Sequence, residues 1–192
     1  MSGIQHIRST TVVIANSNID TDQLMPARFL TTTTREGLGK HLFADWRYDK
    51  DGNPIASFVL NQPSFQAAQI LVAGPNVGCG SSREHAPWGL LDYGFKAIIS
   101  SQIADIFKNN CLKNGLLPIV VNPTLHAQLL ANPGEQLHID IEAQTLTGAD
   151  AQPHHFDLEP FAKYCLLNGV DETGYLLSQA AAITAFEERT SR

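Results

Sequence analysis

The sequence predicts an α/β fold in which a mixed sheet is flanked by helices. Strand and helix patterns alternate from residue 70 to residue 131, which is typical of parallel strands joined by helical crossovers. The pattern changes at residues 137–142, where apolar and polar side chains alternate with a period of two. That period indicates a half-buried strand, which we expect to be antiparallel.

The N-terminal third is expected to contain one strand and a long loop. Residues 10–15 are β-branched and apolar, so they predict a strand, and the polar, turn-forming run 16–22 follows it. Residues 30–63 combine a threonine run, glycines and scattered aromatic side chains. We expect a long, partly ordered excursion there, and loops of such length are often functional.

The remaining elements follow from periodicity and from turn residues. In order, the sequence predicts strands over 70–73, 97–100 and 116–121, and helices over 82–93, 102–109 and 123–131. We expect the strand at 137–142 to pair with a second strand near 155–158. Apolar residues at helical spacing over 172–189 predict a closing amphipathic helix in the C-terminal segment 170–192. A single domain over residues 1–192 accommodates these elements.

The composition excludes several classes of protein. Hydrophobic residues make up 43% of the chain and charged residues 17%, as in globular proteins. The net charge is -6 and the basic residues are scattered, which argues against nucleic acid as a partner. No apolar run approaches the length of a membrane span, and the N-terminus has no signal-peptide pattern. We therefore expect a cytoplasmic protein.

The cysteines argue against a metal cofactor held by this chain alone. Cys79, Cys111 and Cys165 are far apart in the sequence. A disulfide scaffold needs paired cysteines, and a zinc site or iron–sulfur cluster needs clustered thiolates. His154 and His155 are adjacent, so on a strand they face opposite ways and make a poor chelate. We expect no metal ligands in this chain.

The segment from Gly78 to His85 carries the clearest functional signal. It lies where a strand gives way to a helix, so unpaired backbone N–H groups and the positive end of a helix dipole are expected to meet there. Ser81 precedes Glu84 by three residues, which is the spacing of a capping box and predicts a helix start at Ser81 or Ser82. Arg83 adds a guanidinium suited to a carboxylate.

These features predict a site for a small polycarboxylate, although a plain capped turn would also explain them. Gly78 and Gly80 permit unusual backbone angles and let a ligand approach the main chain. The segment is neither a nucleotide P-loop nor the elbow of a hydrolase, because both of those motifs are absent.

Residues 78–88 (Gly-Cys-Gly-Ser-Ser-Arg-Glu-His-Ala-Pro-Trp) resemble the signature of the swivelling β/β/α domain of the aconitase superfamily. Residues 18–26 (Asn-Ile-Asp-Thr-Asp-Gln-Leu-Met-Pro) resemble the Thr-Asp loop of that domain. Residues 41–47 and 168–169 narrow the resemblance to the small subunits of 3-isopropylmalate dehydratase. It covers nearly the whole chain.

The resemblance implies a hydro-lyase that acts with a large subunit, which carries a [4Fe-4S] cluster. The pair would interconvert 2-isopropylmalate and 3-isopropylmalate through isopropylmaleate, in leucine biosynthesis.

The resemblance also implies roles for individual residues. Ser81 matches the family's catalytic base, while Ser82 and Arg83 match residues that bind a substrate carboxylate, which Gly80 lets approach the main chain. Asp22 matches an aspartate that reaches the active site, where we expect it to orient a histidine of the large subunit.

The identity of the substrate is less constrained. An isopropyl group needs an apolar pocket, to which Leu24, Met25, Phe29 and Leu30 could contribute, whereas Arg28 could instead bind a carboxylate. Small subunits of homoaconitase or of a citraconate-type hydratase are therefore alternatives.

Two other classes of function are weaker alternatives. One is a standalone hydrolase that uses Cys79 or Ser81 with His85, although the members of such triads are usually scattered along the sequence. The other is a carboxylate-binding module without chemistry. Trp46 is expected in the core or at a subunit interface.

Overall fold

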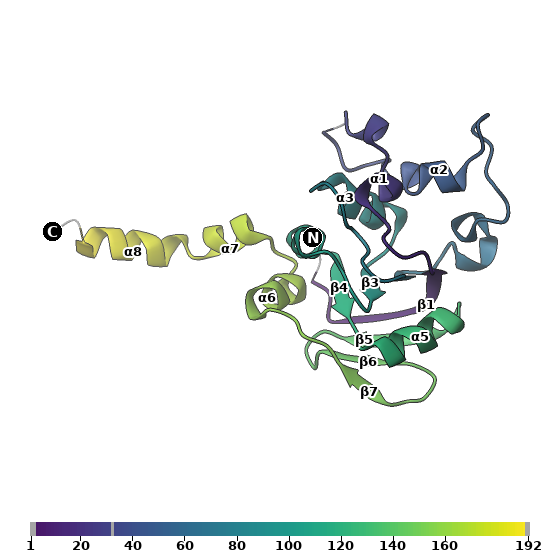
Figure 1. Ribbon diagram of the computed structural model, residues 1–192. Coiled ribbons are helices and arrows are strands. Elements are labelled where there is room, and N and C mark those ends of the chain that lie inside the picture. The colour runs from purple at the N-terminus through teal and green to yellow at the C-terminus, as the bar shows by residue number, and fades with distance from the viewer. Residues whose placement is uncertain (1–2, 32, 191–192) are drawn as a thin grey trace.

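One mixed sheet joins a parallel half to an antiparallel half (Figure 1). The computed structural model describes residues 3–31 and 33–190. Within them the seven strands follow the order β4-β3-β2-β1-β5-β6-β7. The strands are β1 (His6–Ile14), β2 (Ile70–Ala73), β3 (Ala97–Ser100), β4 (Leu117–Val120), β5 (Gln136–Asp140), β6 (Thr145–Thr147) and β7 (Pro153–His155).

Strand β1 belongs to both halves of the sheet. Its residues 11–14 pair in parallel with β2, and its residues 6–10 pair antiparallel with β5. Strands β3 and β4 continue the parallel half, so the carboxyl ends of β1 to β4 meet at one edge. The loops that follow β1 and β2 therefore leave the sheet side by side, as ligand-binding loops of open α/β sheets do.

Both faces of the parallel half are buried. Along β2, Ile70 and Val72 enter one apolar cluster while Leu71 and Ala73 enter the other, and all four side chains are buried. The alternation continues in β3. Continuous apolar strands of this kind are expected where helices cover both faces of a parallel sheet.

Short elements and two longer helices cover the face that carries Leu71. They are α1 (Thr21–Leu24), η1 (Ala27–Phe29), η2 (Gly39–His41), α2 (Ala44–Arg47), η3 (Val59–Asn61), η4 (Pro63–Phe65), α3 (His85–Tyr93) and α4 (Asp105–Asn114). The segment expected as an excursion, residues 30–63, contributes Leu38, Leu42, Phe43 and Leu60 to this core. Its apolar residues are therefore structural.

The opposite face is covered by α5 (Pro123–Ala131), α6 (Pro160–Asn168) and the antiparallel strands. Two further helices, α7 (Glu172–Ser178) and α8 (Ala180–Thr190), extend away from the sheet (Figure 1). None of the helices in the described residues combines the length and the apolar character that crossing a membrane requires.

Four sequence-based expectations about these elements are wrong. The helix expected at 82–93 begins at His85. The helix expected at 102–109 is α4, which runs from Asp105 to Asn114 and so ends five residues later than expected. Strand β7 pairs with β6, a three-residue strand too short to show a period, and not with β5. The closing helix at 172–189 is two helices, because the chain turns at Gln179. Helix α6 was not expected.

The packing of α4 against the loop after β2 depends on the missing side chain of Gly78. Gly78 has φ +75°, and a Cβ built on it would lie 2.1 Å from the ring of Phe107 in α4. The exposed Gly52 has a similar φ of +83° but open space around its Cα. Substitution of Gly52 would therefore test the backbone conformation alone, whereas substitution of Gly78 would test the backbone conformation together with the contact to Phe107.

We expect Gly52→Ala to lower the free energy of unfolding by about 1 kcal/mol, because a left-handed backbone disfavours a side chain. Gly78→Ala is expected to lower it by about 3 kcal/mol, because overpacking against Phe107 adds to that cost. Urea unfolding of both variants measures the difference. Equal losses in the two variants would show that Phe107 moves freely and that the contact sets no constraint.

Candidate active site

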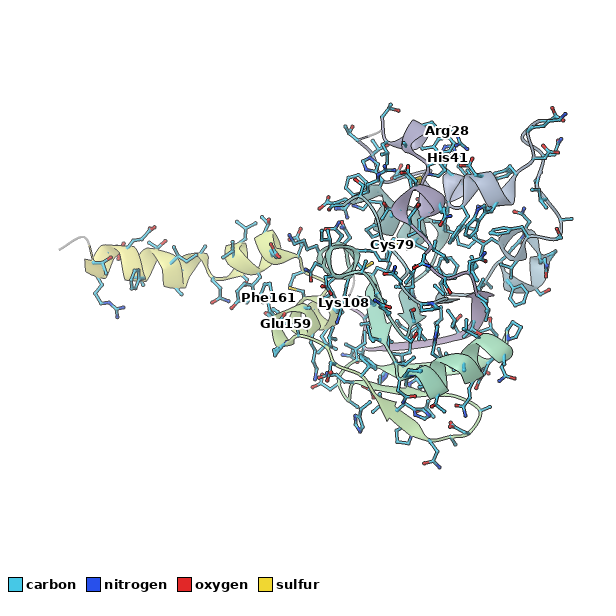
Figure 2. All side chains as sticks on the ribbon, viewed as in Figure 1. Arg28, His41, Cys79, Lys108, Glu159 and Phe161 are labelled. Carbon is cyan, nitrogen blue, oxygen red and sulfur yellow. The ribbon has the colours of Figure 1, made fainter. Side chains whose placement is uncertain are left out.

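A cavity of about 270 Å³ opens at the edge where β1 and β2 end. Its walls come from the loop after β1, the loop after β2 and the start of α4: Thr21, Gly78, Gly80, Ser81, Ser82, Arg83, Ala104, Asp105, Ile106 and Phe107. In Figure 2, Cys79 marks the position of the glycine loop in the body of the molecule. Five of the residues singled out in the sequence therefore line one cavity: Gly78, Gly80, Ser81, Ser82 and Arg83.

Backbone hydrogen bonds hold the two loops together. The Gly78 N–H donates to the Ile19 carbonyl at 2.7 Å, and the Thr21 N–H donates to the Cys79 carbonyl at 3.0 Å. Asp20 and Cys79 form an isolated parallel bridge. The pairing of β1 with β2 thus resumes beyond the ends of the strands, and it fixes the two loops relative to each other.

The buried Thr21 hydroxyl positions Ser81. Its Oγ1 donates to the Ser81 carbonyl at 2.8 Å, and the Thr21 side chain is fully enclosed. Ser81 itself is exposed and lines the cavity, while its backbone carbonyl is held by Thr21. No motif in the sequence pointed to this role of Thr21.

The capping box of this region lies at α1 and not at the glycine loop. Asp20 Oδ1 accepts from the Gln23 N–H at 2.7 Å, and Gln23 Oε1 accepts from the Asp20 N–H at 2.9 Å. The box expected at Ser81 and Glu84 is wrong, because Glu84 is itself the N-cap of α3 and its side chain caps nothing. The spacing Asp20-x-x-Gln23 is the signal that would have located it.

Asp22, presented by α1, makes a two-pronged ion pair with Arg83. Arg83 Nη1 donates to Asp22 Oδ1, and Arg83 Nη2 donates to Asp22 Oδ2 at 2.8 Å. These hydrogen bonds are the main reason why the pKa of Asp22 lies below the usual value of an aspartate. The Arg83 side chain is 16% exposed and that of Asp22 is 51% exposed. A guanidinium has five N–H donors, so this geometry leaves three for a ligand.

The helix end at the cavity belongs to α4. Residues 104–107 line the cavity, and the N-cap, Ala104, has no side chain that could cap the first turn. The first amides of a helix have no intrahelical acceptor and carry the positive end of its dipole. The expectation that the helix following Ser81 supplies these groups is wrong, because α3 begins beyond the cavity lining.

A chain of amide hydrogen bonds ties Ser82 to α3 and α4. Asn110 Nδ2 lies 3.4 Å from Ser82 Oγ, Asn114 Nδ2 donates to the Asn110 carbonyl at 2.8 Å, and Trp88 Nε1 donates to Asn114 Oδ1 at 2.7 Å. Both asparagines are buried. Two asparagines one helical turn apart are the sequence signal for this contact, but their partners are set by the tertiary structure.

Several other candidate residues lie elsewhere. Leu24 and Met25 are fully buried in the core, so the expectation that they wall a substrate pocket is wrong. Arg28 pairs with Asp45 and stands over the ring of Phe29, 4.6 Å from its centroid. Figure 2 shows Arg28 beside His41, at a separate cavity that both residues line.

No histidine or cysteine is among the described residues that line this cavity. Cys79 and His85 are not among the cavity-lining residues, which weakens the hydrolase alternative. Burial raises the pKa of the Cys111 thiol well above its usual value, so this group is inert. The described residues contain no group of three or more His, Cys, Asp or Glu side chains that could hold a metal ion.

Comparisons with known proteins are consistent across sequence and structure. Residues 1–124 match the aconitase C-terminal domain. The chain is 59% identical over 187 residues to the 3-isopropylmalate dehydratase small subunit of Anaeromyxobacter dehalogenans strain 2CP-C, covering 97% of this chain and 98% of that one. The protein of the same name from Roseiflexus sp. strain RS-1 is 52% identical over 191 residues, with coverages of 97% and 94%.

A solved structure has the same fold. The crystal structure of 3-isopropylmalate dehydratase from Methanocaldococcus jannaschii matches with a TM-score of 0.71, over 94% of this chain and 98% of that chain. Its sequence identity is 24%, so this match speaks for the fold.

We expect Asp22 to remain ionised until the pH falls well into the acid range. Its folded pKa is lowered, so the ion pair with Arg83 is present at neutral pH and is lost as the pH falls through that lowered pKa. In Arg83→Gln the pKa should rise toward the usual value of an aspartate. Carboxyl ¹³C NMR measures both.

Arg28→Gln is the control for this titration, because Arg28 pairs with Asp45 and should leave Asp22 unaffected. An Asp22 titration that is the same in the wild type and in Arg83→Gln would contradict the pairing.

Proposed function

The chain belongs to the aconitase C-terminal domain family, within it to the small subunits of 3-isopropylmalate dehydratase, and on that basis we propose its function. It is one half of a cytoplasmic hydro-lyase that interconverts 2-isopropylmalate and 3-isopropylmalate through isopropylmaleate in leucine biosynthesis. The fold expected for this family, a mixed sheet flanked by helices, is confirmed. The observation that carries the proposal is the single cavity lined by Ser81, Ser82 and Arg83.

Arg83 is the proposed binding group for a substrate carboxylate, and Ser82 and the first turn of α4 assist it. Two of its N–H groups are taken by Asp22, and the remaining three can meet a substrate carboxylate. The Ser82 hydroxyl and the first-turn amides of α4 lie in the same cavity wall and add further donors. Asp22 holds the guanidinium plane in one orientation, which favours two-pronged recognition.

Ser81 is the proposed base. The reaction requires removal of a proton from a carbon beside a carboxylate, and a serine alkoxide is basic enough for that step. An isolated serine hydroxyl is too weak an acid to ionise readily. The Arg83 charge and the N-terminus of α4 would lower that cost, because both line the same cavity as Ser81.

Asp22 is proposed to act across the subunit boundary. Half of its side chain is exposed although two of its lone pairs are engaged by Arg83. A carboxylate that remains ionised and faces outward can orient a histidine of the large subunit, as such carboxylates do in other enzymes.

The cluster is proposed to belong to the large subunit. A [4Fe-4S] cluster does not fit this chain, because its described residues contain no group of three or more His, Cys, Asp or Glu side chains that could hold a metal, and Cys111 is buried. The roles given to Ser81, Arg83 and Asp22 need no iron ligand from this chain.

Reconstitution with the large subunit under anaerobic conditions tests the proposal. The mixture should convert 2-isopropylmalate to 3-isopropylmalate, with isopropylmaleate detected by its absorbance, and neither subunit should do so alone. Against a panel of 2-hydroxy dicarboxylates and citrate, we expect kcat/KM to favour isopropylmalate by about 100-fold, because an isopropyl pocket rejects a third carboxylate. Turnover by the isolated chain would contradict the proposal, and a preference for another substrate would favour the homoaconitase or citraconate alternatives.

Ser81→Ala should lower kcat by a factor of about 10² to 10⁴ while subunit association is retained, since the hydroxyl acts in proton transfer and bears no structural hydrogen bond among those described. Ser82→Ala should mainly raise KM. Ser57→Ala, at an exposed serine outside the cavity, is the matched control. Wild-type kcat in Ser81→Ala would remove the base assignment.

A further inference from the structure

The exposed apolar surface of this chain is concentrated at its C-terminal end. Among the described residues, large apolar side chains that are exposed occur at Ile106, Val120, Phe161, Tyr164, Leu176, Leu177, Ile183 and Phe186. All but the first two belong to α6, α7 and α8. Exposed apolar side chains that gather in one part of a protein are typical of interaction sites.

Residues 172–190, which we call the C-terminal arm, make no core of their own. No residue of α7 or α8 is buried, and Figure 1 shows both helices leaving the body of the molecule. At 1.5 Å per residue, a helical arm of this length is about 28 Å long. Isolated helices shorter than about 12 to 15 residues are marginal in water, so the arm gains from a partner surface.

The root of the arm is held in a defined direction. Tyr175 packs edge-on against Phe161 and Tyr164 of α6, with ring centroids 5.0 Å and 5.4 Å apart. Asp171 caps α7 by accepting a hydrogen bond from the Gly174 N–H at 2.7 Å. The arm therefore projects from a fixed base.

Helix α4 connects the base of the arm with the active-site cavity. Its first turn lines that cavity, where the side chain of Ile106 is exposed. Residues Leu112 and Lys113 from the other end of α4 line a groove of about 260 Å³, together with Phe161 and Val170 at the root of the arm. Asn109 of α4 and Glu159, the N-cap of α6, line the same groove. Helix α4 is about 15 Å long, so it links the active-site cavity at its first turn to the groove at the root of the arm.

We propose that the C-terminal arm and the groove at its root form a docking surface for the large subunit of the hydro-lyase. This inference rests on the proposed function: a subunit that completes the cavity covers Ile106 and reaches the groove along α4. Ile183 and Phe186 are three residues apart, so they share one face of α8 and provide its apolar contact. A helix laid along a partner is a common form of recognition.

The test compares two charge-matched double variants of the full chain. Ile183→Glu with Phe186→Glu places two negative charges on the apolar face of α8. Ala181→Glu with Ala185→Glu places the same charges on the far side of the same helix, at positions that are also exposed. Both variants should fold as the wild type does, because α8 buries nothing. Circular dichroism and thermal unfolding check this.

Association with the large subunit is measured by sedimentation velocity and by titrating activity with that subunit. We expect the Ile183→Glu/Phe186→Glu variant to raise the apparent Kd about 10- to 100-fold, as loss of central apolar contacts does, and to recover wild-type kcat at saturation. The alanine-site variant should match the wild type.

Equal Kd values for both variants and the wild type, in an active complex, would overturn the docking role and leave the proposed function intact. A wild-type chain that binds the large subunit without turnover would overturn the function, while the Kd comparison still tests the arm. A third outcome would also overturn the proposal. The wild-type chain alone could sediment as a dimer, and the Ile183→Glu/Phe186→Glu variant as a monomer with unchanged affinity for the large subunit. The arm would then bind a second copy of this chain.

Discussion

The parallel pairing of β1 with β2 is the constraint on which the site depends. Their register places Ile14 beside Ala73, so both strands end at the same level. The bridge between Asp20 and Cys79 then continues the pairing past the strand ends, between residues far apart in the sequence. Because these contacts are made by the backbone, they hold the two loops together without using the hydroxyl of Ser81. What they do require is Gly78, since no other residue leaves room for Phe107.

The same constraint sets the electrostatics of the cavity. It brings the carboxylate of Asp22 to the guanidinium of Arg83, and it brings the uncapped first turn of α4 to the serines. An exposed ion pair contributes little to stability, so the value of the pair lies in orientation. A guanidinium that is already fixed loses less side-chain entropy when a ligand carboxylate arrives.

Periodicity predicted the buried strands and α5 well, because β2 and β3 are continuous apolar runs with clear turn residues around them. It failed where tertiary contacts override a local motif. Ser81 and Glu84 have capping-box spacing, yet the chain there is held by Thr21 and Asn110, and the helix starts later. Strand β6 was missed because three residues carry no period. The sequence shows the amphipathic pattern of residues 172–189, but such a pattern does not identify the surface against which the apolar side chains pack.

Site and arm differ in how closely each is tied to the fold. Thr21 is buried and donates a hydrogen bond to the Ser81 carbonyl, so a substitution of Thr21 would disturb both the cavity and the packing of the core. The arm buries no residue of its own, and its contact with the body passes through Tyr175 alone among the ring contacts described. Substitutions on α8 can therefore change association while the core remains intact. A chain arranged in this way can fold first and assemble afterwards.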